Sequence, residues 1–200
     1  MAKKLDLCSI RKTAEAFGIH RADGDALQQG ASSVLGTNEI APLSMAVAFA
    51  GIANNGETHS EVAIDKIIGA DGVELPIPES KVTQSVEREV VAGMTYAMQR
   101  VMTGGTATAS NRNTFPKVPM IGKTGTTDAS KDTWMTGAST KVATVAGVFN
   151  VSGIARSQRN TFFSGLQAAT ARHRMWPDVM SVANAKYGGD DFAEPANDAV

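Results

Sequence analysis

The 200 residues are enough for one domain or a large part of one, and a content of 42% hydrophobic and 20% charged residues is ordinary for a globular protein. The net charge of −1 leaves no excess of basic residues to neutralise phosphates, which argues against nucleic acid as the main partner. The single cysteine excludes an internal disulfide and a cysteine-based zinc site, and no apolar run approaches a membrane span in length.

The N-terminal quarter of the chain is predicted to be mainly helical. Residues 1–5 are typical of the end of a helix already under way, which indicates a fragment of a longer protein. Ser9 can cap a helix that Gly18 closes. Pro42 suits the first turn of a further helix, which ends at residues 54–56. The apolar side chains of that helix recur at helical spacing and predict a core-facing stripe of Met45, Ala48, Phe49 and Ile52.

The middle of the chain combines a hairpin with a long helix. Residues 63–68 and 73–75 are predicted strands joined by a tight turn. Residues 87–102 have the most regular helical pattern, and Gly104 and Gly105 end it. Its predicted buried face consists of Val90, Met94, Ala97, Met98 and Val101. The small and polar residues 106–113 are predicted to form a loop.

Three predicted strands, residues 119–127, 132–139 and 141–151, follow one another with links so short that neighbours must be antiparallel. The third is almost continuously apolar, which is typical of a central strand covered on both faces. We therefore expect an α/β (α+β) fold, with an antiparallel sheet flanked by helices.

The C-terminal part is predicted to be helical over residues 166–187, with a kink or a late start because of Pro177. Residues 188–200 carry acidic side chains and have little to bury, so we expect a mobile tail or linker after a domain that spans residues 1–187. No repeat is found.

The residues with the clearest chemistry lie on the first of the three strands. Side chains alternate along a strand, so Thr124 and Thr126 share one face while Lys123 and Gly125 share the other. Two hydroxyls can grip a carboxylate, a lysine supplies positive potential, and a glycine allows close approach. A backbone N–H at an exposed strand edge can also serve an oxyanion hole.

Residues 122–127 have two other possible interpretations, a phosphate-binding loop and an ordinary strand. A nucleotide-binding P-loop would need a glycine where Lys117 stands and a helix after the lysine, whereas Gly125 and a strand-like run follow. An ordinary strand with a solvated lysine stays open, because Lys-Thr-Gly by itself is a weak signal. The order of the surrounding segments is more specific.

Five segments carry a resemblance to a known family when they are taken in chain order: residues 34–46, 54–56, 101–107, 123–127 and 132–137. With these segments the chain resembles the penicillin-binding transpeptidases of the serine β-lactamase and D,D-peptidase superfamily, most of all class A enzymes of actinobacterial type. Residues 123–127, Lys-Thr-Gly-Thr-Thr, match the third motif of that family, and the other segments follow the same order as in the family.

The resemblance implies roles for these positions. Lys123 would shuttle protons and hold the acidic end of the donor, while the N–H of Thr126 would form half of the oxyanion hole. Thr124 and Thr126 would bind the carboxylate of a peptidoglycan stem peptide or a β-lactam, Gly125 would leave room, and Thr127 would line the cleft. Thr106 is a further lining candidate. No cofactor or metal is implied.

The family acylates the serine of a Ser-x-x-Lys motif, and here only Ser9 with Lys12 has that spacing. We interpret Ser9 as a helix cap and Lys12 as solvated, because the pair stands too close to residues 36–45. No Ser-x-Asn motif precedes Gly36 either. The nucleophile is therefore expected upstream of this chain, together with the rest of the domain, and this chain alone is expected to be inactive.

The resemblance also implies a parent protein on the extracytoplasmic face of a bacterial membrane, held by an N-terminal anchor outside this chain, with a glycosyltransferase domain. Three rivals stay open: a β-lactamase or D,D-carboxypeptidase of the same superfamily, a non-catalytic sensor or scaffold, and a structural piece without binding. His20, His59 and His173 lack metal-ligand spacing. The arginines of the C-terminal part are interpreted as a solvated basic face: Arg156, Arg159, Arg172 and Arg174.

Overall fold

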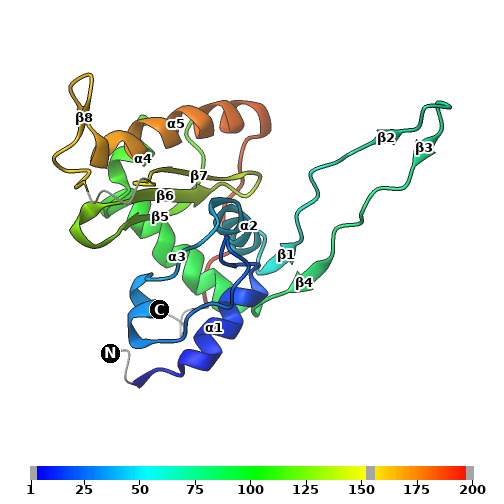
Figure 1. Cartoon of the computed structure of the whole chain (residues 1–200), viewed down its shortest axis with the longest axis horizontal. Coiled ribbons are helices and arrows are strands. Elements are labelled where there is room, and N and C mark those ends of the chain that lie inside the picture. Colours follow the sequence, from blue (N-terminus) through cyan, green and yellow to red (C-terminus); the bar gives the residue numbers. More distant parts are fainter. Residues whose placement is uncertain (1–3, 152–155, 197–200) are drawn as a thin grey trace.

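A three-stranded antiparallel sheet lies at the centre of the computed structural model, which describes residues 4–151 and 156–196. Its strands are β5 (Ile121–Thr126), β6 (Thr133–Ala138) and β7 (Ala143–Val148), in the order β5-β6-β7. Helix α5 (Ala168–Tyr187) packs on one face and helix α2 (Pro42–Ala53) on the other (Figure 1). The predicted α+β class is confirmed.

The three strands were predicted to within a few residues, but the position of the third was wrong. In the described ranges β7 pairs only with β6 and its residues are half-buried, whereas β6 is central and is mostly buried. The continuous run of apolar residues indicates that helices cover both faces of β7. It does not indicate how many neighbouring strands β7 has, because strands pair through backbone hydrogen bonds.

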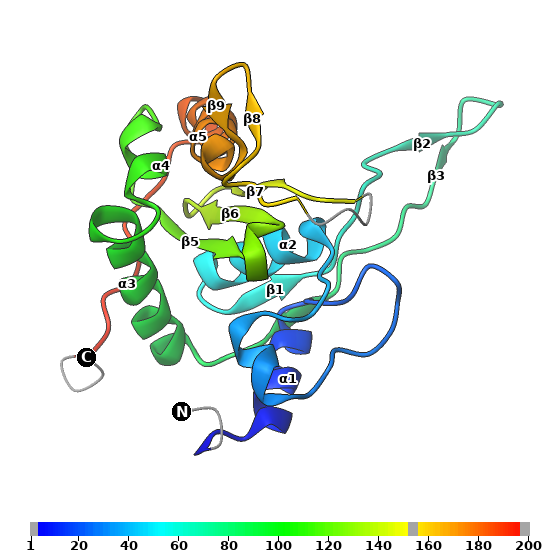
Figure 2. The same cartoon turned by 60° about the vertical axis from the view of Figure 1, so that its left-hand side comes forward.

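Helix α3 (Arg88–Gly104) runs beside β5, as the view in Figure 2 shows. Its predicted buried face was right in part: Met94, Met98 and Val101 are half-buried and pack against the two cores, whereas Val90 and Ala97 are exposed. The buried side chains of the helix are Val91, Ala92, Thr95 and Met102, so the buried face is rotated slightly about the helix axis. Thr95 interrupts the helical spacing of apolar residues from which the buried face was predicted. Its burial is tolerated because its hydroxyl donates to the Ala92 carbonyl at 3.0 Å.

The first helix, α1 (Leu7–Ala16), begins three residues earlier than predicted. Its cap is Asp6, whose carboxylate accepts hydrogen bonds from the N–H groups of Cys8 at 2.9 Å and Ser9 at 3.3 Å. The interpretation of Ser9 as the cap was therefore wrong, and its hydroxyl donates to Asp6 instead. Helix α2 begins with Pro42 as predicted, and its stripe is buried except for the half-buried Met45.

Two departures from the predictions lie near the C-terminal helix. Residues predicted as a loop contain a short helix, α4 (Thr108–Asn113), and α5 does not start at Pro177 but runs through it from Ala168 as one helix. A kink at Pro177 stays a prediction. The two departures are connected. Pro177 lacks an N–H for the His173 carbonyl, and that carbonyl accepts a hydrogen bond from Asn113 Nδ2 of α4 at 3.4 Å instead.

Two apolar clusters hold the helices to the sheet. On the α2 side, Phe17, Phe49 and Ile52 pack with Ile121 and other buried side chains. On the α5 side the buried members are Met102, Ala107, Met120, Met135, Trp176 and Met180. Each face of the sheet thus contributes to a separate core, so the position of β5 is fixed from both sides.

The predicted tail is described as far as residue 196, and it contacts the domain. The Asp190 N–H donates to Thr140 Oγ1 at 2.8 Å, Asp190 pairs with Lys141 at 2.6 Å, and Phe192 is only 9% exposed. The assignment of these residues to a linker stays a prediction, as does the boundary at 187.

A long hairpin arm projects from the body of the domain (Figure 1). Its base is the pair β1 (Glu57–His59) and β4 (Val82–Gln84), which sequence reasoning missed. Its outer pair, β2 (Ile67–Ile68) and β3 (Glu74–Leu75), confirms the predicted hairpin with shorter strands. The remaining short elements are η2 (Ala31–Leu35), η3 (Asp128–Ser130), β8 (Phe162–Phe163) and β9 (Leu166–Gln167). No helix among the described residues is long and apolar enough to cross a membrane.

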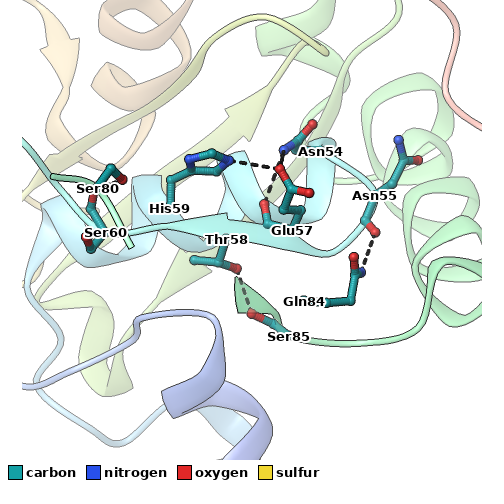
Figure 3. A network of polar contacts seen from close by, with 9 residues as sticks. All are labelled: Asn54, Asn55, Glu57, Thr58, His59, Ser60, Ser80, Gln84 and Ser85. Carbon is teal, nitrogen blue, oxygen red and sulfur yellow. Dashed lines mark hydrogen bonds and ion pairs between the residues drawn. The ribbon is translucent and has the colours of Figure 1, made fainter. Parts of the chain in front are cut away.

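Hydroxyl groups fasten the base of this arm to the domain (Figure 3). Ser85 Oγ donates to the Ala16 carbonyl at 2.6 Å, so Thr58 Oγ1 must be the donor in its 2.8 Å contact with Ser85 Oγ. Thr58 is 6% exposed, and water therefore has little access to these groups.

The substitution Ser85→Ala is expected to lower the free energy of unfolding by about 1–2 kcal/mol, because it leaves two half-buried polar groups without a partner. Ser80→Ala is the matched control, since the Ser80 hydroxyl bonds the Ser60 carbonyl in an exposed position where water can replace it. Urea denaturation compares the two variants, and equal effects would contradict the prediction.

Candidate active site

The strand β5 presents one backbone edge that no other strand covers in the described part of the chain. Beyond its end, the Thr127 N–H donates to the Asp132 carbonyl at 3.1 Å, toward the β6 side. N–H directions alternate along an antiparallel strand, so the Thr126 N–H points to the opposite, free edge. A free N–H at such an edge can stabilise an oxyanion.

A cleft of about 300 Å³ lies beside this strand, and all five residues predicted for the site line it: Lys123, Thr124, Gly125, Thr126 and Thr127. Trp134 and Thr136 of β6 continue the same wall. The opposite wall comes from residues far away in the sequence, namely Leu35, Gly36, Asn38, Ile40, Met45, Phe49 and Met98. The cleft is therefore apolar on one side and rich in donors on the other.

Met45 and Phe49 were predicted only as core residues, and they also line this cleft. Phe49 is 5% exposed and belongs to the α2-side core, so one aromatic ring serves both. Helical spacing identifies the inner face of α2 but does not show that the face ends at a cleft. Sequence reasoning could not have separated the two roles.

The threonine hydroxyls on β5 are already placed by neighbours. Thr124 Oγ1 lies 2.6 Å from Thr106 Oγ1, which the turn between α3 and α4 presents. Thr127 Oγ1 accepts from the Asp132 N–H at 2.9 Å and donates to its carboxylate at 3.2 Å, so this hydroxyl closes the β5–β6 turn. Either hydroxyl of the Thr124–Thr106 pair can be the donor, so one of the two protons stays available to a ligand. The Thr127 hydroxyl already donates to Asp132 and accepts from it.

Lys123 is exposed at the cleft, and its Nζ donates to the Thr124 carbonyl at 3.0 Å. Among the described residues no carboxylate lies within 4.0 Å of its ammonium group. An ammonium group without an acidic partner gives the cleft a positive potential and leaves two of its donors for a ligand.

Arg172 on α5 contacts the same strand, which sequence reasoning missed. Its Nη1 donates to the Gly125 carbonyl at 2.6 Å and to Thr126 Oγ1 at 3.0 Å. The interpretation of Arg172 as part of a solvated basic face was therefore wrong. One signal was present, since Arg172 lies one helical turn before Trp176 and so shares the buried face of its helix.

His173 supports this arginine from the same helix. Arg172 Nε donates to His173 Nε2 at 3.2 Å, which leaves the proton on Nδ1, where the Ser110 hydroxyl lies at 2.8 Å. Burial, with a smaller contribution from the Arg172 charge, lowers the pKa of His173 below its usual range. Neutral His173 is thus the form that can accept from Arg172.

The only Ser-x-x-Lys pair lies away from these residues. Ser9 and Lys12 are exposed on α1, and neither lines the cleft. In the described ranges no serine lines it, and no three His, Cys, Asp or Glu side chains are arranged to hold a metal. The residues brought together offer donors for an anion or an oxyanion.

An uncovered strand edge with hydroxyl, ammonium and backbone N–H donors thus lies beside a largely apolar cleft. The family model for the penicillin binding protein transpeptidase domain matches residues 1–172, and the chain belongs to this family. Its curated relatives are penicillin-binding proteins 1A and 1B, which are class A enzymes, so the resemblance found in the sequence is confirmed.

Among these relatives, penicillin-binding protein 1A of Aquifex aeolicus is 31% identical over 179 residues, which cover 88% of this chain and 23% of that protein. Penicillin-binding protein 1B of Vibrio cholerae is 26% identical over 137 residues, which cover 68% of this chain and 17% of that protein. The chain thus spans about a fifth of the length of these relatives.

Solved structures show the same fold. PonA1 of Mycobacterium tuberculosis in complex with penicillin V superimposes with a TM-score of 0.80 and 22% identity, covering 98% of this chain and 55% of that one. Penicillin-binding protein 1A of Haemophilus influenzae gives a TM-score of 0.75 with 19% identity, covering 95% and 32% of the two chains.

Proposed function

We propose that this chain is the part of a peptidoglycan D,D-transpeptidase that binds the donor's carboxylate and supplies half of the oxyanion hole. The observation that carries the proposal is the free edge of β5, where the Thr126 N–H and the Lys123 ammonium belong to one cleft. Among the described residues this ammonium has no carboxylate partner. A developing oxyanion and a terminal carboxylate are both negative, and this edge offers donors for both.

In the proposed reaction a serine from another part of the protein attacks the amide carbonyl between two D-alanines of a stem peptide. The carbonyl oxygen gains negative charge, which the Thr126 N–H stabilises together with the N–H of that serine. The C–N bond then breaks, D-alanine leaves with a proton, and an ester to the serine remains. An amine of a neighbouring peptide attacks the ester and releases the serine.

Each cleft residue has a role in this scheme. Lys123 moves protons beside the serine hydroxyl and holds the acidic end of the donor, while Thr124 and Thr126 bind the terminal carboxylate. Gly125 leaves room for the donor backbone, and a Cβ there would also crowd Trp134 of β6, at 3.2 Å from its Cβ. Thr127 contributes shape rather than a hydrogen bond, since Asp132 already occupies its hydroxyl.

The proposal extends to the whole protein by way of its relatives. The remaining part of the transpeptidase domain would supply the nucleophile, a glycosyltransferase domain would precede it, and an N-terminal segment would anchor the protein. Its place would be the extracytoplasmic face of the bacterial membrane, where stem peptides and β-lactams are met.

Acylation by a fluorescent penicillin tests the proposal, read by denaturing gel and intact mass. We expect the intact protein to form a covalent adduct and the 200-residue chain to form none. An adduct on the short chain would place the nucleophile within it and overturn the division proposed here. Absence of an adduct on the intact protein would favour a non-catalytic sensor, and product analysis with an acceptor amine separates transfer from hydrolysis.

A further inference from the structure

We propose that Arg172 is a positioning residue for acyl transfer, which holds the Gly125–Thr126 peptide and the Thr126 hydroxyl so that both donors of Thr126 face the cleft. The inference rests on the proposed function and assigns a role outside the Lys-Thr-Gly strand. Its starting point is one guanidinium nitrogen that donates both to the Gly125 carbonyl and to Thr126 Oγ1.

The first step concerns the peptide bond. The carbonyl of Gly125 and the N–H of Thr126 belong to the same planar unit and point in opposite directions. The Gly125 carbonyl faces β6 and also accepts from Arg172 at 2.6 Å, so the Thr126 N–H points to the free edge of β5. Rotation of this peptide would break a charge-assisted hydrogen bond, so the arginine opposes the motion that would withdraw the oxyanion donor.

The second step concerns donor strength. A hydrogen bond to a peptide carbonyl polarises the whole amide and makes its N–H a better donor, and the effect is larger when the partner is charged. The Gly125 carbonyl receives such a bond from a guanidinium. Arg172 thereby acts on the oxyanion through the peptide without touching the substrate.

The third step concerns the hydroxyl. A threonine hydroxyl has one proton to donate and can accept as well. Arg172 Nη1 donates to Thr126 Oγ1 at 3.0 Å, so the threonine is the acceptor in this contact. Its own proton is then free for a further acceptor, such as a carboxylate in the cleft. Arg172 has no acceptor atoms, so it can never compete for that proton.

The arginine itself is held by its surroundings. Trp176, one turn later on α5, is fully buried, and the His173 ring accepts from Arg172 Nε at 3.2 Å. In the described part of the chain no carboxylate lies within 4.0 Å to draw the guanidinium away from the strand. Half-burial, with a smaller contribution from Arg159, lowers the pKa of Arg172 from its high usual value.

The test compares Arg172→Gln with the matched control Arg174→Gln in the intact protein. Arg174 is an exposed arginine two residues further on the same helix. Stopped-flow measurement of the acylation rate at saturating fluorescent penicillin should show a loss of about 10- to 100-fold for Arg172→Gln, less than complete removal of an oxyanion donor. The control should remain within twofold of the wild type.

A second variant separates orientation from charge and from folding. Arg172→Lys keeps the positive charge but replaces the planar fork with a single flexible ammonium group, so it should recover only part of the lost rate. The unfolding midpoint of each variant shows whether the domain is intact, and Arg172→Lys decides the matter where Arg172→Gln is unfolded.

Each remaining outcome has a definite meaning. A wild-type rate in folded Arg172→Gln, or full activity of Arg172→Lys, would overturn the positioning role. An equal loss in Arg174→Gln would overturn it too, because general loss of positive charge would then explain the result. Failure of the wild-type protein to form any adduct would instead reject the proposed function itself.

Discussion

Replacement of Lys123 by alanine is expected to reduce acylation of the intact protein by penicillin about 100- to 10,000-fold, the range associated with loss of a positioned proton-transfer group. The folded structure should be little affected. The Lys123 side chain is exposed, and the hydrogen bond of its Nζ in the described structure goes to the Thr124 carbonyl of the next residue. Its removal therefore leaves no buried group unsatisfied.

A control lysine lies in the same hairpin. Lys131 is exposed in the turn between β5 and β6 and carries the same charge, but it does not line the cleft. We expect Lys131→Ala to acylate at the wild-type rate, with unfolding midpoints for both variants within a few degrees of the wild type. Labelling of Lys123→Ala within threefold of the wild type would contradict the role assigned to this lysine.

The sequence contained enough information to locate β5, β6 and β7 and the residues that β5 presents. Short links force antiparallel neighbours, and alternation then assigns Lys123 and Gly125 to one face and Thr124 and Thr126 to the other. These are local properties, and the structure brings all four residues to one cleft. The local half of the site could therefore be predicted.

The other half depends on packing across long separations. Arg172 reaches Gly125 over 47 positions, and its spacing from Trp176 indicates only a shared helix face, not the strand that the guanidinium contacts. The same limit explains the rotated face of α3, where a buried threonine stands in the place of an apolar residue. Where a side chain's role comes from a distant partner, periodicity can indicate the buried face but does not identify the partner.

The loop predicted at residues 106–113 illustrates how one misassignment hides another. Small polar residues favour turns in isolation, yet Ser110 and Thr114 are fully buried and bond to partners in the fold. Pro177 of α5 has no N–H to donate to the His173 carbonyl, and Asn113 Nδ2 of α4 donates to that carbonyl instead. Helix α4 and the unbroken α5 support each other, so neither could be predicted alone.

Trp176 is the residue whose loss should cost the domain the most stability. Its side chain is 0% exposed, it packs with Met102, Met135 and Met180, and its Nε1–H donates to the Thr144 carbonyl at 3.2 Å. Gly137 on β6 leaves the space for its ring, since a Cβ there would lie 2.7 Å from Cζ2 of the indole. The indole thus joins α5 directly to the sheet.

Trp176→Ala is expected to lower the free energy of unfolding by about 3–5 kcal/mol, because a large cavity forms between α5 and the sheet. Trp176→Phe should cost less, and part of that loss comes from the Thr144 carbonyl, which is left without its donor. Urea denaturation followed by helical circular dichroism measures both, with Val182→Ala as the control, since Val182 is 71% exposed on the same helix.

The same substitution links stability to the site. Arg172 lies one turn before Trp176, so a helix that moves into the cavity would displace the guanidinium from its position at the Gly125 carbonyl. We therefore expect folded Trp176→Ala to lose acylation rate as well, whereas Val182→Ala should lose neither rate nor stability. A loss of less than about 1 kcal/mol in Trp176→Ala would show that α5 is held to the sheet by other contacts.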